Sequence, residues 1–247
     1  MSKKRWLILG TRPTATEIAI SCRKLGVLAE PVSAVELALR DDVSSELSRV
    51  GSLDVSVFTS RTAVGIINDY APRELKERIV GSRCYAIGPS TSELLRSTTG
   101  VSVVKVPRRG DSEGLVELLR REKLGRVGLF SSVKRSNHLR DFLAHNSSIL
   151  FEPKLYDLRP KQAAISVALG RWSIAEIAGF AFTCSTAVEA IPATLEVPES
   201  VRTVAMGPRT AATLRRAGYQ PMVPSSYDIG GIVDAILKLH SNNAGVV

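Results

Sequence analysis

The sequence predicts a duplicated α/β protein in which two similar halves each form a parallel sheet flanked by helices. Short apolar runs of strand length alternate with stretches of helical periodicity, which is typical of βαβ units. Three dipeptides also recur 119 to 124 positions apart: Gly88-Pro89 and Gly207-Pro208, Glu30-Pro31 and Glu152-Pro153, and Phe58-Thr59 and Phe182-Thr183. A repeat that keeps nearly the same spacing over most of the chain indicates an internal duplication.

The composition is that of an ordinary soluble globular protein, with 44% hydrophobic and 23% charged residues among 247. No apolar run approaches the roughly 20 residues that a membrane span needs, and Trp6–Leu9 is too short for the core of a signal peptide. Cys22, Cys84 and Cys184 are scattered, without the spacing of a metal or redox motif. We therefore expect a cytoplasmic, reduced protein without a membrane partner.

The net charge of +9, from 33 Lys and Arg against 24 Asp and Glu, favours an anionic partner. Nucleic acid, an acidic membrane surface and a polycarboxylate all fit this charge, and so does a generally basic surface without specific meaning. Aromatic residues make up only 5% and do not alternate with the basic ones, so a stacking platform for single-stranded nucleic acid is not expected.

The chain begins with a predicted strand at residues 6–9, which form a short apolar run. Residues 10–13 contain Gly and Pro and predict a turn. An amphipathic helix is predicted from Thr16 to Leu25, with Gly26 in the usual place after a helix C-terminus. Residues 27–32 follow as an extended segment.

The rest of the first half continues this alternation. Strands are predicted at 55–58, 84–87 and 101–106, and helices at 63–67, after residue 89, and at 114–121. Pro89 suits the first turn of a helix because its missing N–H is not needed there. Ser90 with Glu93 fits a capping box, and Asp111 fits a helix cap.

The second half repeats this order of elements. Strands are predicted at 127–130, 180–182 and 203–206, an extended segment at 151–155, and helices after 135, after 208 and at 232–239. Strands that alternate with helices at this spacing predict right-handed βαβ units on a parallel sheet.

The two Gly-Pro segments predict a pair of anion-binding turns. In each, a buried strand is followed by a sharp turn and a helix, whose first N–H groups and positive dipole end would face an anion. Ser90, Thr91, Arg209 and Thr210 stand at these helix starts and are candidate binding residues. Ser and Thr also cap helices in many proteins, so capping and binding both remain open. Two such turns in one chain suggest a ligand with several negative groups.

The chain resembles the uroporphyrinogen-III synthase family. The resemblance rests on Val57–Ser60, Ile87–Thr91 and Met206–Thr210, together with the opening Gly10–Pro13 and the segment Leu155–Asp157. It runs from about residue 6 to 239, and the order and spacing of the motifs are more specific than any one of them.

The resemblance implies two similar α/β lobes with a flavodoxin-like fold, joined by a two-stranded linker. One lobe would contain residues 1–33 and 159–247, and the other residues 36–153, with linkers at about 33–36 and 153–159. The repeat by itself would equally allow two sequential lobes, so this exchange of the first strand and helix comes from the resemblance alone.

The resemblance also implies a reaction. Linear hydroxymethylbilane would lose water and close to uroporphyrinogen III, with the terminal D ring inverted through a spiro intermediate, in haem, sirohaem or cobalamin biosynthesis. The enzyme would be a cyclising hydro-lyase and a monomer, and no metal or organic cofactor is implied. The substrate carries eight carboxylates, which agrees with the polyanion that the two turns and the net charge suggest.

Two matched loops after the Phe-Thr repeats supply further candidate binding residues: Ser60, Arg61, Cys184, Ser185 and Thr186. In the family the position after Phe-Thr is usually Ser, whereas the second copy here has Cys184. A thiol is a poorer hydrogen-bond donor, so Ser185 is an alternative for that contact. A covalent role for Cys184 is not expected, since no neighbouring His or Asp is arranged to activate it.

Tyr156 is the candidate catalytic residue, because it matches the family's tyrosine near the linker. Its phenol could assist departure of the substrate's hydroxyl as a weak acid, directly or through water. A hinge tyrosine with a packed ring and a wet hydroxyl is an equally good interpretation.

Arg12, Lys134 and Arg135 follow predicted strands and are candidate binding residues, although the sequence does not decide which of them contacts substrate. His138, His145 and His240 lack metal-ligand spacing. The scarcity of acid–base groups predicts catalysis mainly by orientation, so that no single side-chain replacement abolishes activity.

Two other functions compete with this interpretation. A non-catalytic anion-binding or regulatory module could use the same duplicated fold, since fold alone does not give function. Cys184 and the altered loop at 131–135 favour this alternative. A nucleic-acid-binding protein is the second alternative, suggested by the charge.

Overall fold

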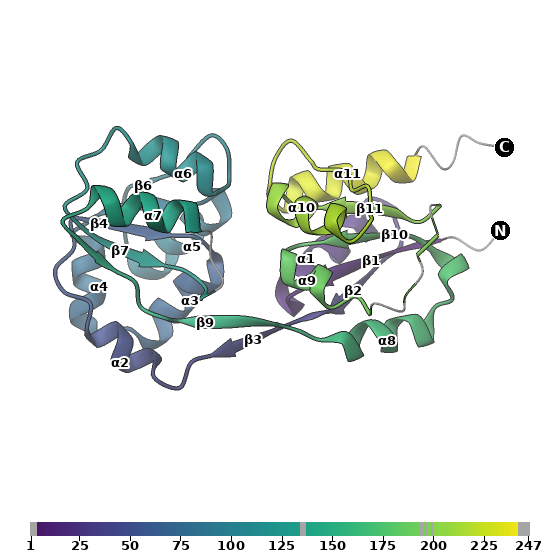
Figure 1. Cartoon of the computed structure of the whole chain (residues 1–247), viewed down its shortest axis with the longest axis horizontal. Helices are drawn as coiled ribbons and strands as arrows, with labels where there is room; N and C mark the ends of the chain where they lie inside the picture. The colour runs from purple at the N-terminus through teal and green to yellow at the C-terminus, as the bar shows by residue number, and fades with distance from the viewer. Residues whose placement is uncertain (1–3, 134–136, 193–194, 196, 199, 242–247) are drawn as a thin grey trace. The chain divides into compact units, whose positions relative to one another are not determined.

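The computed structural model describes residues 4–133, 137–192, 195, 197–198 and 200–241 (Figure 1). The chain forms two compact units: unit 1 contains Met1–Leu37 and Arg159–Val247, and unit 2 contains Ala38–Leu158. Strands β3 (Val35–Leu39) and β9 (Tyr156–Pro160) pair in a two-stranded sheet. Both points at which the chain passes from one unit to the other lie in this sheet.

Unit 1 contains a parallel four-stranded sheet in the order β11-β10-β1-β2. Its strands are β1 (Arg5–Gly10), β2 (Ala29–Ser33), β10 (Ile177–Phe182) and β11 (Arg202–Ala205). Its helices are α1 (Arg12–Lys24), α8 (Gln162–Arg171), α9 (Ser185–Glu189), α10 (Pro208–Arg216) and α11 (Ile229–Ser241), with a 3-10 turn at Ile174–Glu176. An isolated parallel bridge between Val204 and Met222 continues the sheet beyond β11.

Helices α1 and α11 cover one face of this sheet. Trp6 and Ile8 point to the same face, as residues two apart in a strand do, and pack with Ile18 of α1 and Ile232 of α11. Helix α9 lies against β1 and β10. A large apolar side chain such as Ile8 or Ile18 stabilises the fold by about 2 kcal/mol when it is fully buried.

Unit 2 contains a parallel five-stranded sheet in the order β6-β5-β4-β7-β8. Its strands are β4 (Val55–Phe58), β5 (Arg83–Ala86), β6 (Val104–Lys105), β7 (Arg126–Phe130) and β8 (Ile149–Phe151). Its helices are α2 (Val43–Ser48), α3 (Arg61–Tyr70), α4 (Arg73–Val80), α5 (Pro89–Thr99), α6 (Ser112–Leu119) and α7 (Asn137–Asn146).

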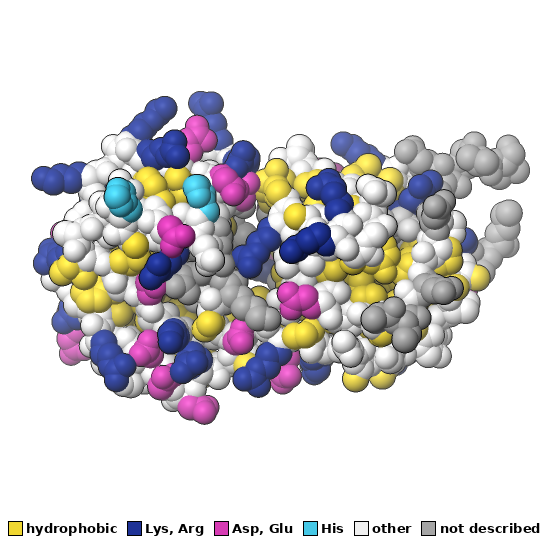
Figure 2. All heavy atoms as spheres, viewed as in Figure 1, with side chains coloured by type: hydrophobic (Ala, Val, Ile, Leu, Met, Phe, Trp, Pro, Cys, Tyr) yellow, Lys and Arg dark blue, Asp and Glu magenta, His cyan; other side chains and the backbone are white. Residues whose placement is uncertain are grey.

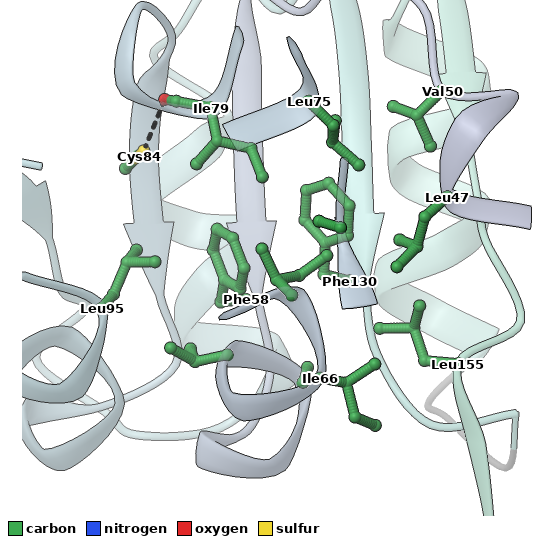
Figure 3. Close-up of a cluster of buried hydrophobic side chains, with 14 of the residues drawn as sticks. Leu47, Val50, Phe58, Ile66, Leu75, Ile79, Cys84, Leu95, Phe130 and Leu155 are labelled. Carbon is green, nitrogen blue, oxygen red and sulfur yellow. Dashed lines mark hydrogen bonds between the residues drawn. The ribbon is translucent and has the colours of Figure 1, made fainter. Parts of the chain in front are cut away.

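Two hydrophobic clusters cover the two faces of the unit 2 sheet. Phe58 and Phe130, the last residues of adjacent strands, stack with ring centroids 4.8 Å apart, among side chains of α2, α3, α4 and α5 (Figure 3). Val57 and Leu129 stand one position earlier and face the opposite way, toward α6 and α7. The sheet is therefore buried on both faces, as parallel sheets usually are.

Both units have a parallel sheet flanked by helices, which confirms the predicted fold class, but their strands follow in a different order along the chain, 3-2-1-4-5 in unit 2. In unit 1 the strands stand in the order 2-1-3-4 counted along the unit, which is the flavodoxin-like order. In each sheet the chain moves outward in opposite directions from two central strands, β1 and β10 in unit 1 and β7 and β4 in unit 2. Each unit thus has a topological switch point, the place where ligands bind in open parallel sheets.

Several predicted boundaries were wrong. The predicted turn at residues 10–13 is only partly a turn, because α1 already begins at Arg12, with Pro13 in its first turn. The predicted capping box of Ser90 and Glu93 does not form. Pro89 is the first residue of α5 and Gly88 is its N-cap, so Ser90 lies inside the helix, too late to cap it. The strand predicted at 101–106 is only β6, Val104–Lys105.

A further repeat lies at the start of α6 and α11. Asp111 Oδ1 accepts a hydrogen bond from the amide of Gly114, and Asp228 Oδ1 accepts one from Gly231, both at 2.8 Å. A Cβ on Gly114 would lie 2.0 Å from the carbonyl oxygen of Arg109, and one on Gly231 would lie 1.9 Å from that of Ser226. Glycine is needed here because another part of the backbone passes so close.

We expect Gly231→Ala to lower the free energy of unfolding by about 2–3 kcal/mol, because the new methyl group cannot fit against the Ser226 carbonyl. Gly230→Ala is the matched control, since its Cβ would meet only Asp228 Oδ1 at an ordinary 3.4 Å. Alanine there should be neutral or stabilise the helix by up to about 1 kcal/mol. Urea unfolding followed by circular dichroism measures both, and equal effects of the two variants would contradict this account.

Candidate functional site

The predicted binding residues that the structure describes follow the carboxyl ends of their own unit's strands. In unit 1 these are Arg12 after β1, Cys184, Ser185 and Thr186 after β10, and Arg209 and Thr210 after β11. In unit 2 they are Ser60 and Arg61 after β4, and Ser90 and Thr91 after β5. Lys134 and Arg135 lie outside the described residues. Each unit therefore presents one polar edge beside its switch point.

The helices α5 and α10 begin in the same way at these edges. Gly88 has φ −162° and ψ 171°, and Gly207 has φ −159° and ψ 176°. The helical hydrogen bonding starts with the Ser92 amide donating to the Gly88 carbonyl at 3.1 Å, and with Ala211 donating to Gly207 at 3.0 Å. Glycine has no side chain to cap the helix, so the first-turn amides are left for water or an anion.

Glycine is not required at these two positions by the fold of the chain. Their backbone is extended, a conformation that any residue adopts. A Cβ on Gly88 would meet no described atom within 4 Å, and one on Gly207 would meet Tyr227 only at an ordinary 3.7 Å. The missing side chain therefore leaves open space directly before each helix, where another molecule can approach the amides closely.

The four predicted residues that follow the two Gly-Pro segments in sequence form two matched pairs. Ser90 and Arg209 are exposed, so their side chains can reach a ligand at the edge. Thr91 and Thr210 are only 3% and 6% exposed, so their side chains pack within the units. Thr91 and Thr210 thus present their amides, rather than their side chains, at the helix start.

Ser60 and Cys184 occupy equivalent N-cap positions at the two switch points. Ser60 has φ −164° and ψ 155°, and Cys184 has φ −160° and ψ 165°. Ser60 Oγ accepts a hydrogen bond from the Ala63 amide at 3.0 Å, whereas Cys184 makes no side-chain cap hydrogen bond within the described part of the chain. Burial raises the pKa of the Cys184 thiol above its usual range, so the thiol stays neutral at neutral pH.

Tyr156, the candidate catalytic residue, is the first residue of β9 and is 3% exposed. Its ring belongs to the cluster around Phe58 and Phe130. Its hydroxyl and Ser60 Oγ share a hydrogen bond of 2.8 Å. The packed ring fits the hinge interpretation, and the hydroxyl contact places Tyr156 behind Ser60 rather than directly at the edge. A catalytic role for Tyr156 stays a prediction.

Sequence reasoning did not nominate Thr59 and Thr183, which the structure places directly at the switch points. The Thr59 amide donates to the Phe130 carbonyl at 3.2 Å, and the Thr183 amide donates to the Leu9 carbonyl at 3.0 Å. Each bond joins the end of one central strand to its neighbour. The Phe-Thr repeat contains the signal, although in the sequence alone it indicates only duplication.

The family comparison decides the identity. The family described as Uroporphyrinogen-III synthase HemD matches residues 16–234. This chain belongs to the uroporphyrinogen-III synthase family. Family membership implies an enzyme of tetrapyrrole biosynthesis that acts on a small-molecule tetrapyrrole. None of the curated proteins compared with the chain matches it.

Solved structures of uroporphyrinogen-III synthases share the fold. A mutant enzyme of the extremely thermophilic bacterium Thermus thermophilus is 19% identical, with a TM-score of 0.63 over 97% of this chain and 99% of that one. The enzyme of Helicobacter pylori is 15% identical, with a TM-score of 0.59 over 96% of this chain and 99% of the other. At this identity the likeness supports the architecture and leaves individual residue roles to the geometry.

One face of this uroporphyrinogen-III synthase family member carries both basic and acidic side chains (Figure 2). On the face shown in Figure 2, Lys and Arg side chains alternate with Asp and Glu rather than gathering in one patch. Among the described residues, no three His, Cys, Asp or Glu side chains are placed to hold a metal ion together. None of the described helices has the length and apolar character needed to cross a membrane.

We expect Ser60→Ala to lower the free energy of unfolding by about 1–2 kcal/mol, because it removes the α3 cap and the partner of the Tyr156 hydroxyl. Cys184→Ser should raise it by about 0.5–1 kcal/mol by supplying the cap that α9 lacks. Denaturant titration measures both changes in the free energy of unfolding.

Tyr156→Phe should lower the free energy of unfolding by less in the Ser60→Ala background than in the wild-type background, because its hydrogen-bond partner is already missing there. Strictly additive losses of stability would show that the two hydroxyls are not coupled.

Proposed function

We propose that this chain is a cyclising hydro-lyase that converts hydroxymethylbilane into uroporphyrinogen III with loss of water. The observation that carries the proposal is the pair of open helix starts at Gly88 and Gly207, where neither backbone nor packing requires glycine. Membership of the uroporphyrinogen-III synthase family supports the same function. We expect a cytoplasmic monomer that needs neither nucleic acid nor a cofactor.

The open amides of α5 and α10 would bind acetate and propionate groups of the substrate. A helix N-terminus carries about half a positive charge and free N–H donors, which suit a carboxylate. Exposed Ser90 and Arg209 would add a hydroxyl and a guanidinium group to these contacts. Arg12 and Arg61, Cys184 or Ser185, and Thr186 through its main chain would contribute at the strand ends. Lys134 and Arg135 are proposed with them.

The reaction depends mainly on how the two ends of the substrate are oriented. The pyrrole nitrogen of hydroxymethylbilane expels the terminal hydroxyl to give an azafulvene, and unguided closure gives the symmetric type I isomer. To form the type III isomer, the substituted carbon of the terminal ring must attack, which gives a spiro intermediate that then rearranges. Fixed amides and cations that hold the carboxylates can select this geometry without a strong catalytic base.

We propose that Tyr156 and Ser60 assist the departure of the substrate's hydroxyl as water. Because the Tyr156 ring is buried, the Ser60 hydroxyl is the group of this pair nearer the edge, and Tyr156 would act through it. A shared hydrogen bond of 2.8 Å allows a proton to be passed along the pair. The contribution is modest, and we expect activity to survive Tyr156→Phe.

Product analysis tests the function directly. The purified chain is incubated with hydroxymethylbilane, and the products are oxidised to porphyrins and separated into the type I and type III isomers. We expect mainly type III product with the protein and type I product in the blank. Type I product alone, at the rate of the blank, would refute the proposal and leave a non-catalytic anion-binding module.

We expect Gly88→Ala and Gly207→Ala each to lower kcat/KM about tenfold or more, because a methyl group would obstruct the approach of a carboxylate to the helix amides. Stability should fall by less than about 1 kcal/mol, since the methyl group meets no close atom of the chain. Gly170→Ala in α8 is the matched control, because its Cβ also has no described neighbour within 4 Å. Wild-type kcat/KM in both edge variants would show that these helix starts do not bind substrate.

A further inference from the structure

The switch point of unit 1 contains an unusually close side-chain contact. Gly10 is the last residue of β1, and Thr183 directly follows β10. A Cβ on Gly10 would lie 2.1 Å from Thr183 Oγ1 and 3.0 Å from its Cγ2. Position 10 is in a strand, where the extended backbone accepts any residue. The glycine is therefore required by the Thr183 side chain, which occupies the space above it.

The corresponding point of unit 2 is built differently. Ser131 follows β7 as Gly10 ends β1, and it carries its own side chain, 5% exposed. The Thr59 hydroxyl lies over the Phe130 carbonyl, to which it donates at 3.5 Å. The main-chain bonds of Thr59 and Thr183 match, but only unit 1 has a glycine gap filled by the threonine side chain.

The loops that follow Thr59 and Thr183 also differ in the side-chain bonds that fix them. Ser60 is fixed by its cap bond to Ala63 and by its bond to Tyr156. Cys184 is the N-cap of α9, a helix of only five residues that begins at Ser185, and its thiol makes no side-chain cap hydrogen bond among the described residues. The sulfur lies near the amides of Thr186 and Ala187 and near the Thr183 side chain. The loop Cys184–Thr186, which contains three proposed binding residues, has no side-chain bond like the one between Ser60 and Tyr156, so the residue just before it contributes to its position.

We propose that Thr183, seated on Gly10, is a positioning residue that fixes the loop Cys184–Thr186 at the carboxyl edge of unit 1. The Thr183 amide holds the main chain to Leu9, and the side chain in the glycine gap fixes the direction in which the loop leaves the strand. The inference rests on the proposed function, because the purpose of the fixed loop is to hold substrate carboxylates. The contact does for unit 1 what the cap and Tyr156 do for Ser60.

Three variants test the contact. Gly10→Ala displaces the Thr183 side chain, Thr183→Gly removes it without any clash, and Thr183→Ser keeps the hydroxyl above Gly10. We expect the first two to raise KM for hydroxymethylbilane about tenfold and to increase the share of type I product. Thr183→Ser should stay within about twofold of wild type. The double variant Gly10→Ala/Thr183→Gly should be no worse than either single variant, because both remove the same contact.

KM, the isomer ratio and thermal stability together distinguish three cases: a positioning role for Thr183, a purely structural role, and a wrong proposed function. Thermal unfolding is measured in parallel, with Gly170→Ala as the control. Lower stability with wild-type KM and isomer ratio in the folded Thr183→Gly enzyme would overturn the inference, as would additive effects in the double variant. If Gly10→Ala does not fold, Thr183→Gly and Thr183→Ser still decide. A wild-type protein that forms only type I product would instead refute the proposed function.

Discussion

The organising constraint is that every helix start at the sheet edges has amide groups that need an acceptor. The chain supplies that acceptor at some starts: Ser60 for α3, Asp111 for α6 and Asp228 for α11. Among the described residues, no side chain caps α5 at Gly88 or α10 at Gly207, as is also true of α1 and α9, and at the two glycines the space before the amides is open. The open space before these two starts, rather than the missing cap alone, leaves room for another molecule to complete the hydrogen bonding.

Duplication explains why this pattern appears twice and why its exceptions are informative. The two Gly-Pro starts agree in backbone angles, first hydrogen bond and exposure of the following residues. The two switch points agree in their main-chain bonds but not in their side chains. Unit 2 has a serine cap tied to a buried tyrosine, whereas unit 1 has an uncapped cysteine and a threonine seated on a glycine. Two units with the same arrangement of strands in space therefore carry two edges that are not chemically equivalent.

The sequence sufficed for the fold class because the repeat and the alternation of strands with helices are properties of contiguous residues. Helix starts were harder, since Pro13 and Pro89 fit more than one position of a first turn, and only the packed helix decides between them. Contacts between distant segments had no local signal. Nothing near Gly10 in the sequence indicates that Thr183 fills the space above it, and nothing near Ser60 indicates the buried hydroxyl of Tyr156. The polar residues that follow the strand ends were predictable from motifs, whereas the contacts that support them were not.

The order of the strands along the chain has a consequence for synthesis on the ribosome. Unit 2 is continuous in sequence, so its five strands are all available once residue 158 has emerged. In unit 1, β1 and β2 are made first, but their neighbour β10 begins only at Ile177. During that interval Trp6, Ile8 and the apolar side of α1 lack their later partners. The nascent chain must keep its own N-terminal segment from aggregating or pairing wrongly until its last third is translated.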